Sequence, residues 1–143
     1  MSALIVDTSA LLAFFDASEP DHAAVSAALT AEAGALVVSP FVVAELDYLV
    51  AARIGVDAEL AVLDELAQGA WDLPEFGAAE LAEARAVVQR YRDQDIGVAD
   101  ASNVVLAGRY GTDRIATLDH RHFSVLHTDR GGAFTLVPGD AGR

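Results

Sequence analysis

The chain has 143 residues, a length that fits one domain, and it has no cysteine, which excludes disulfides and thiolate zinc sites. Its formal net charge is −13, and all nine basic residues are arginine. Such an acidic surface repels phosphate backbones and suits a basic protein partner.

Strands and helices are expected to alternate along the first half of the chain. Residues 2–6 form an uncharged run with β-branched members, which predicts a short buried strand. Gly34 and Gly55 each follow a run with helical spacing and are typical of helix ends. We expect strands over residues 2–6 and 36–38, and helices over residues 8–15, 20–33, 39–54 and 57–68.

The same alternation continues through the second half. We expect helices over residues 78–92 and 98–110, strands over residues 115–118 and 134–137, and a short strand at Trp71–Leu73. Because no repeat, linker or low-complexity segment interrupts the pattern, we predict a single domain over residues 1–143 with its core over about residues 3–137. Such alternation implies an α/β fold with a central parallel sheet of four to five strands flanked by helices.

The amino-terminal residues carry no sign of export. Residues 1–6 have no basic side chain, and Asp7 then interrupts the apolar run. No apolar stretch approaches the length of a membrane span. We therefore expect a cytoplasmic protein that does not contact a membrane.

Four carboxylates stand at the ends of apolar runs: Asp7, Glu45, Asp100 and Asp119. Acidic side chains are rarely buried unless they are paired or bind a metal. Asp7 and Asp119 each follow a predicted strand, at the end of the sheet where α/β folds bind ligands. Hard oxygen ligands suit Mg²⁺ or Mn²⁺, and a cation explains why carboxylates that repel one another are gathered. The set predicts a divalent-metal site, which can activate water for phosphodiester hydrolysis.

Each carboxylate also has an ordinary structural explanation. Asp7 could cap the helix over residues 8–15. Asp100 lies in the first turn of a helix, where an acid gains about 0.3–1 kcal/mol from the helix dipole, and Asp119 could be a turn residue. Glu45 has apolar neighbours, so we expect it not to be a solvated charge. These explanations account for the acids singly but not as a set.

Polar residues close to the acids are candidate supporting groups. Thr8 and Ser9 could cap a helix, or hydrogen-bond a metal-bound water or a phosphate. Asn103 lies one turn after Asp100 and could orient its carboxylate. Arg121 could contact a substrate phosphate, or else pair with a neighbouring acid.

The absence of lysine removes several other functions. A P-loop nucleotidase needs a GxxxxGK[ST] loop, which is missing. Phosphoaspartyl phosphatases and response-regulator receivers also end a first strand in an aspartate, but they normally use a lysine near the phosphate. The arginines cluster in residues 85–92 and 109–121, which could offset the repulsion of phosphate by the acidic surface.

Four segments resemble, in order and spacing, the four motifs of PIN-domain ribonucleases, in particular the VapC toxins of bacterial toxin–antitoxin pairs. The segments are Val6-Asp7-Thr8-Ser9-Ala10-Leu11, Ser39-Pro40-Phe41-Val42-Val43-Ala44-Glu45-Leu46, Gly97-Val98-Ala99-Asp100-Ala101 and Ala116-Thr117-Leu118-Asp119-His120-Arg121-His122-Phe123. Single motifs of this kind are short, but four in order are specific. The resemblance spans the chain from Leu4 to about Val137.

The resemblance implies a PIN-like three-layer fold and identifies Asp7, Glu45, Asp100 and Asp119 as the catalytic and metal-binding quartet. Asp7 and Asp100 would be the firmest ligands, Asp119 the next, and Glu45 would reach the metal through water. Thr117 matches a polar position that the family keeps near the metals. The implied activity is Mg²⁺-dependent RNA hydrolysis, with Mn²⁺ as the other candidate ion, leaving 5′-phosphate and 3′-hydroxyl ends on a tRNA or rRNA.

The resemblance also implies partners. It points to a VapB-like antitoxin with a basic, DNA-binding half, a partner that suits the charge of −13. Family members usually form homodimers that bind antitoxin in larger complexes.

Two other functions stay open. His120 and His122 could act as an acid–base pair in metal-free RNA cleavage, since histidine titrates in the required range. Alternate residues of an extended segment face opposite ways, however, which places this pair poorly. The non-enzymatic alternative is an acidic module that binds a basic partner, with its carboxylates serving as caps and surface charge.

Overall fold

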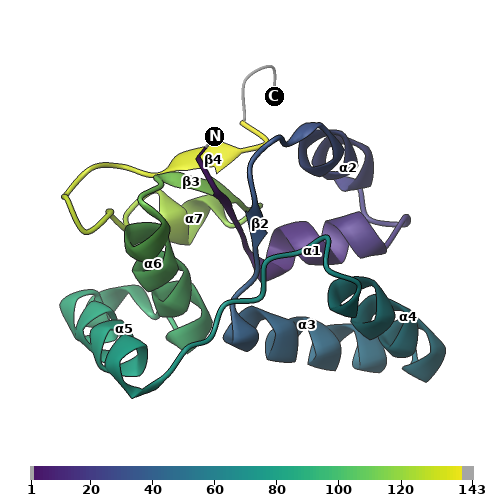
Figure 1. Ribbon diagram of the computed structural model, residues 1–143, viewed down its shortest axis with the longest axis horizontal. Helices are drawn as coiled ribbons and strands as arrows, with labels where there is room; N and C mark the ends of the chain where they lie inside the picture. The colour runs from purple at the N-terminus through teal and green to yellow at the C-terminus, as the bar shows by residue number, and fades with distance from the viewer. Residues whose placement is uncertain (1, 140–143) are drawn as a thin grey trace.

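The computed structural model describes residues 2–139 (Figure 1). Its strands are β1 (Leu4–Val6), β2 (Leu36–Val37), β3 (Arg114–Ala116) and β4 (Thr135–Val137). Its helices are α1 (Thr8–Phe15), α2 (His22–Ala31), α3 (Pro40–Arg53), α4 (Val56–Ala67), α5 (Ala78–Arg90), the 3₁₀ helix η1 (Arg92–Gln94), α6 (Val98–Tyr110) and α7 (His120–Phe123). Among these helices, none is long and apolar enough to cross a membrane.

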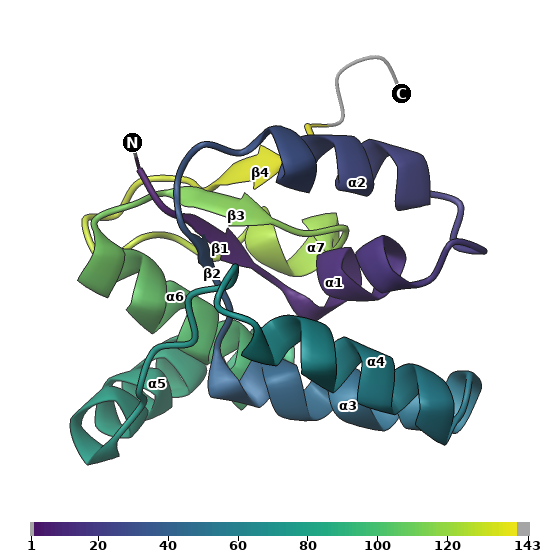
Figure 2. The same cartoon turned by 45° about the vertical axis from the view of Figure 1, so that its right-hand side comes forward.

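The four strands form one parallel sheet in the order β2-β1-β3-β4. Figures 1 and 2 show this sheet at the centre, with α1 and α2 on one side of it, α5 and α6 on the other, and α3 and α4 beneath. The predicted α/β fold with a parallel sheet flanked by helices is therefore confirmed. The chain runs from β1 outward to β2 and later returns to place β3 on the other side of β1, so the order reverses between β1 and β3. Ligands of open α/β sheets bind at such a reversal.

The alternation of side chains along β1 divides the core into two parts. Leu4 and Val6 pack into the cluster formed by helices α1 to α4, whereas Ile5 packs with residues of α6 and α7. All three side chains are fully buried because successive residues of a strand point to opposite faces and both faces are covered. The uncharged run at residues 4–6 is the sequence signature of that double burial.

Most element boundaries lie within two residues of the predicted ones, and the exceptions have physical causes. Trp71–Leu73 makes only an isolated bridge between Asp72 and Val37 and is not a strand of the sheet. The Trp71 side chain is instead buried against Phe14 and Phe15, which explains the apolar character of the segment. The four-residue helix α7 was not predicted because it is too short to show a periodicity.

Gly34 has a role other than the predicted helix stop, since α2 already ends at Ala31. A Cβ atom at Gly34 would lie 2.1 Å from the backbone oxygen of Ser2. Only glycine permits this approach of the α2–β2 connection to the residues that precede β1.

Candidate active site

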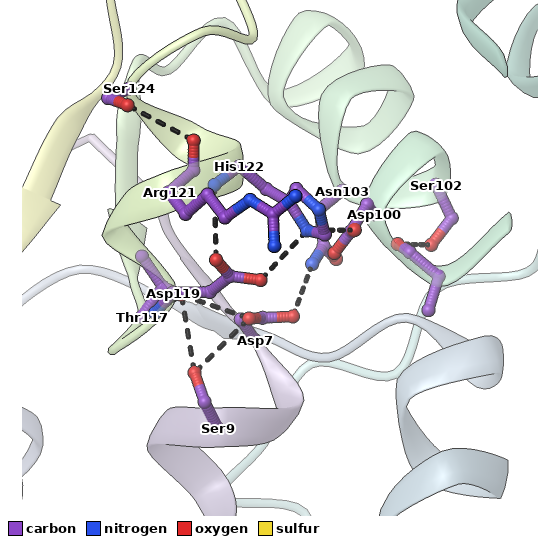
Figure 3. Close-up of polar contacts among 11 residues, drawn as sticks. Asp7, Ser9, Asp100, Ser102, Asn103, Thr117, Asp119, Arg121, His122 and Ser124 are labelled. Atoms are coloured by element: carbon purple, nitrogen blue, oxygen red, sulfur yellow. Dashed lines mark hydrogen bonds and ion pairs between the residues drawn. The ribbon is translucent and has the colours of Figure 1, made fainter. Parts of the chain in front are cut away.

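The candidate site lies beyond the carboxyl ends of β1 and β3, where the strand order reverses. Asp7 directly follows β1, and its backbone N–H donates to the oxygen of Ala116 at the end of β3. Thr117 follows β3 and is fully buried. Asp7 occupies the N-cap position of α1, yet its side chain makes no capping hydrogen bond. The capping explanation therefore does not account for its carboxylate, which points into the site (Figure 3).

The Asp7 carboxylate is buried, with only 4% of the residue exposed, and is held by three side-chain donors. Thr117 donates to Oδ2 at 2.9 Å, and Ser9 donates to the same oxygen at 3.2 Å. Asn103 donates from Nδ2 to Oδ1 at 3.1 Å. Burial raises the pKa of Asp7, while these hydroxyl donors lower it. Asn103 was expected to orient Asp100. Its amide instead donates to Asp7, at the start of α1.

Ser9 and Thr117 also fix the backbone that carries Asp119. The Ser9 hydroxyl accepts from the Leu118 N–H at 2.9 Å, and the Thr117 hydroxyl accepts from the Asp119 N–H at 2.9 Å. Asp119 then caps α7, since its Oδ1 accepts from the His122 N–H at 3.1 Å. Its second oxygen, Oδ2, faces the His122 imidazole, with His122 Nδ1 2.9 Å away.

Asp100, Asp119 and His122 form the centre of the site. His122 Nδ1 lies 3.1 Å from Asp100 Oδ2 and 2.9 Å from Asp119 Oδ2, and it has no hydrogen-bond partner among residues 2–139. One ligand atom from each residue lies within 4.8 Å of the others. Burial and then the neighbouring charge of Asp7 raise the pKa of Asp100 to about 7, against an ordinary value of 3.8. Two carboxylates that repel each other and an imidazole nitrogen, all this close together, form a donor set that fits a divalent cation.

Glu45 departs from the expectation that it would not be solvated, because it is exposed. The buried stripe of α3 is formed by Val42, Leu46 and Val50 at intervals of four residues. Glu45 is one residue out of phase with that stripe and therefore faces outward. It still borders the same cavity as Asp7 and Asp100, and its charge contributes to the raised pKa of Asp100.

The cavity that joins these acids has a volume of about 480 Å³. It is lined by Asp7, Thr8, Ser9, Leu12, Glu45, Leu49, Arg53, Asp95, Gly97, Asp100, Asp119 and His122. Thr8 is buried, and its hydroxyl has no hydrogen-bond partner among the described residues. Arg53 was not identified from the sequence, because it lies outside the motif that begins at Ser39, 14 residues further along the chain.

The remaining predicted residues lie around this cavity in different ways. Arg121 is exposed on α7 and is not among the residues that line the cavity, and within residues 2–139 it forms no ion pair with an acid. Other arginines of the two predicted clusters are engaged elsewhere: Arg109 pairs with Glu80 and Glu83, and Arg114 pairs with Glu32. The sequence clusters therefore do not form one phosphate-binding surface at the site.

The histidine pair lies on a helix rather than on an extended segment, which corrects the predicted geometry of His120 and His122. Residues two apart on a helix do not face each other either, so the pair is again poorly placed for joint action. His122 faces the acids, while His120 Nε2 is buried without a hydrogen-bond partner in the described part of the chain.

Comparison with known proteins gives the same family as the sequence motifs. Residues 4–127 match the PIN domain family. The chain is 66% identical over 135 residues to Ribonuclease VapC26 of Mycobacterium tuberculosis, an alignment that covers 94% of this chain and 100% of that protein.

Solved structures share the fold. The crystal structure of VapC20 of Mycobacterium tuberculosis, described as a sarcin-ricin loop cleaving toxin, superposes with a TM-score of 0.74 at 19% identity and covers 78% of this chain and 86% of its own. VapBC2 of Rickettsia felis, solved bound to a DNA fragment from its promoter, gives a TM-score of 0.69 at 15% identity over 94% of this chain and 98% of its own.

Proposed function

The chain belongs to the PIN domain family and within it to the VapC ribonucleases, and from this premise we propose that it is a toxic, metal-dependent endoribonuclease. It acts as a single PIN domain in the cytoplasm. It hydrolyses phosphodiester bonds in a structured RNA and leaves 5′-phosphate and 3′-hydroxyl ends. The observation that carries the proposal is the convergence of Asp7, Asp100 and Asp119 on one cavity at the carboxyl ends of β1 and β3.

Asp7, Asp100 and Asp119 would hold the Mg²⁺ ion, or Mn²⁺ in its place, with Glu45 reaching it through water. When bound, the ion activates a water molecule and stabilises the charge that develops on the phosphodiester. Ser9, Thr117 and Asn103 do not meet the substrate in this proposal. They hold the buried Asp7 carboxylate in one orientation, as the groups around metal ligands generally do.

His122 lies between Asp100 and Asp119, within 3.1 Å of an oxygen of each. The His122 imidazole lowers the pKa of Asp100, so it offsets part of the repulsion between the acids. His122 therefore holds the two carboxylates near each other before the ion binds, and it is a positioning residue in this proposal.

The substrate is a tRNA or an rRNA. The sarcin–ricin loop of rRNA is the first candidate to test, because the structural relative VapC20 is described as cleaving it. Specific RNA recognition targets loops whose bases are unstacked.

The partner is a VapB-like antitoxin with a basic half. Two observations support it: the net charge of −13 favours a basic protein over RNA, and large exposed apolar residues concentrate on α3, on α4 and in the turn between them. These are Tyr48, Ile54, Val56, Leu60 and Leu63. Exposed apolar surface of this kind is typical of a site that a partner covers. The toxin forms a homodimer that binds antitoxin in a larger complex.

The test is cleavage of total RNA by the purified chain in Mg²⁺ and in EDTA, followed by mapping of the RNA ends. We expect cleavage only with Mg²⁺, at one site or a few sites, with 5′-phosphate ends, and inhibition by the cognate antitoxin. Cleavage that persists in EDTA would support the histidine pair His120 and His122. Absence of any cleavage, with antitoxin binding retained, would support the non-catalytic acidic module.

A further inference from the structure

One face of α3 carries four residues spaced four apart: Phe41, Glu45, Leu49 and Arg53. Residues at this spacing lie one above the other on a helix, and we call this row the α3 stripe. At 1.5 Å per residue, the stripe is about 18 Å long. It therefore runs from an aromatic ring, past a carboxylate of the proposed active site, to a guanidinium.

Two cavities meet along the α3 stripe. The first is the carboxylate cavity of about 480 Å³, bordered by Glu45, Leu49 and Arg53. The second has a volume of about 330 Å³ and is bordered by Phe41 and Glu45. Glu45, Gly97 and Asp100 line both of them, so the two cavities are parts of one groove with the acids at their junction.

The Phe41 end of the groove is apolar and well supported. Phe41 and Phe76 are in edge-to-face contact, with centroids 5.2 Å apart and an interplanar angle of 89°. Val98 on the opposite wall is 39% exposed. A buried hydrogen bond of 2.6 Å between the Ser39 and Ser102 hydroxyls ties the start of α3 to α6, which fixes the two walls relative to each other.

The Arg53 end of the groove is cationic. Among residues 2–139, Arg53 is the one arginine that lines the carboxylate cavity. Within residues 2–139 its ion pair is a 4.0 Å contact with Glu19, and its side chain is 56% exposed. Exposed pairs of this kind contribute little, so Arg53 is free to exchange Glu19 for another anion.

We propose that the α3 stripe is the binding surface for a single strand of RNA: Phe41 stacks on a nucleobase on one side of the scissile phosphate, and Arg53 binds a backbone phosphate on the other side. This inference rests on the proposed ribonuclease function and adds to it the track of the substrate. Aromatic rings that stack on unstacked bases, combined with cations that follow the backbone, are the general means of single-strand recognition. A length of about 18 Å spans several nucleotides, since stacked nucleotides of one strand repeat every 3.4 Å or so.

Binding is measured by fluorescence anisotropy with a labelled hairpin RNA that carries the sarcin–ricin loop sequence, and with a mixed-sequence RNA ten-mer. All proteins carry Asp7→Asn, so that cleavage does not complicate the reading. Affinity for RNA falls as salt rises. In this background, Arg53→Gln should make that fall shallower, reducing the magnitude of the slope of log affinity against log salt by about 0.7–1, the change expected for one lost phosphate contact. Arg130→Gln is the matched control, because Arg130 is exposed in a loop beside Thr112 and Ser2, which precede β3 and β1 at the other end of the sheet. It should leave the slope unchanged.

The aromatic contact is tested by removing bases from the hairpin one at a time. One abasic substitution should weaken binding about 5- to 150-fold, which corresponds to the 1–3 kcal/mol of a stacked base. Phe41→Leu keeps an apolar side chain against Phe76. In this variant, the same abasic substitution in the RNA should weaken binding much less than it does in the parent protein. The thermal midpoint of Phe41→Leu is measured together with its RNA binding to verify that the variant is folded. Phe41→Met provides a second variant if Phe41→Leu does not fold.

The outcomes separate the inference from the proposed function. If Arg53→Gln and Phe41→Leu bind both RNAs as their parent does, or if the parent binds neither RNA, the α3 stripe is not an RNA surface. If these variants lose antitoxin binding and keep RNA binding, the groove receives a protein segment and the inference is overturned. If RNA binding depends on the stripe while the chain with Asp7 intact cleaves nothing in Mg²⁺, the inference stands and the ribonuclease function fails.

Discussion

Replacing Asp100 by asparagine is expected to stabilise the metal-free protein at pH 8, although it removes a proposed metal ligand. The side chain of Asp100 is only 16% exposed, and burial together with Asp7 raises its pKa to about 7 from 3.8. Between about pH 4 and pH 7 the folded protein therefore binds more protons at this residue than the unfolded chain does. Its contribution to stability must fall as the pH rises through that window.

The size of the effect follows from the same pKa. Each pKa unit corresponds to about 1.4 kcal/mol, so ionising Asp100 above pH 7 costs the fold at most about 4 kcal/mol. Solvent screening of this partly exposed group reduces the cost, and we expect Asp100→Asn to gain about 1–3 kcal/mol at pH 8. For a chain of this length, that gain corresponds to roughly 4–12 °C in the thermal midpoint.

The assay is thermal unfolding of wild type and Asp100→Asn in EDTA from pH 4.5 to pH 8, with Asp64→Asn on the exposed face of α4 as the control. The midpoint difference between Asp100→Asn and wild type should grow from near zero to its full value over this range. Mg²⁺ should raise the midpoint of wild type at pH 8 much more than that of Asp100→Asn. A variant that is less stable than wild type at pH 8 in EDTA would refute the reasoning that the acids repel one another in the absence of the ion.

Three further substitutions test groups around the site. Asn103→Ala removes the amide that donates to Asp7 Oδ1, and it should weaken Mn²⁺ binding about 10- to 100-fold in a calorimetric titration; unchanged affinity would contradict this supporting role. Arg121→Ala should raise KM for RNA with little change in kcat, since an exposed cation binds substrate and transition state alike; an unchanged KM would count against phosphate contact. Ser102→Ala breaks the buried hydrogen bond to Ser39 and should cost about 1–2 kcal/mol in denaturant unfolding, so a midpoint equal to that of wild type would show that this bond does not support the fold.

The parts of the site that follow strands could be predicted because strand ends are visible in the sequence. Asp7 and Asp119 stand after apolar runs, and a parallel sheet brings its carboxyl ends to one edge. The burial of Glu45 was predicted wrongly. Its apolar neighbours indicated the core, but Glu45 is one residue away from the buried stripe of α3 and faces outward. A phase error of this size cannot be resolved from a helix that has apolar residues on most of its faces.

Other features depend on contacts between distant parts of the chain. Asn103 was assigned to Asp100 because the two are close in sequence, whereas its partner Asp7 lies 96 residues away. His122 could have been identified from its position three residues after Asp119, one helical turn, had the helix α7 been predicted. Arg53 borders the acids only because α3 runs along the whole groove, which no local pattern reveals.

The most direct test of the proposed mechanism is the rate of RNA cleavage in Mg²⁺ by wild type, Asp7→Asn and Asp100→Asn, with folding verified for each protein by its thermal midpoint. Both variants keep the size and shape of the side chain, remove its charge and replace one carboxylate oxygen by an amide nitrogen. We predict that wild type cleaves RNA and that both variants, although folded, lose at least a hundredfold in rate, since each loses a ligand of the ion that catalyses hydrolysis. Cleavage by either folded variant at the wild-type rate would contradict the assignment of these carboxylates to the catalytic metal site.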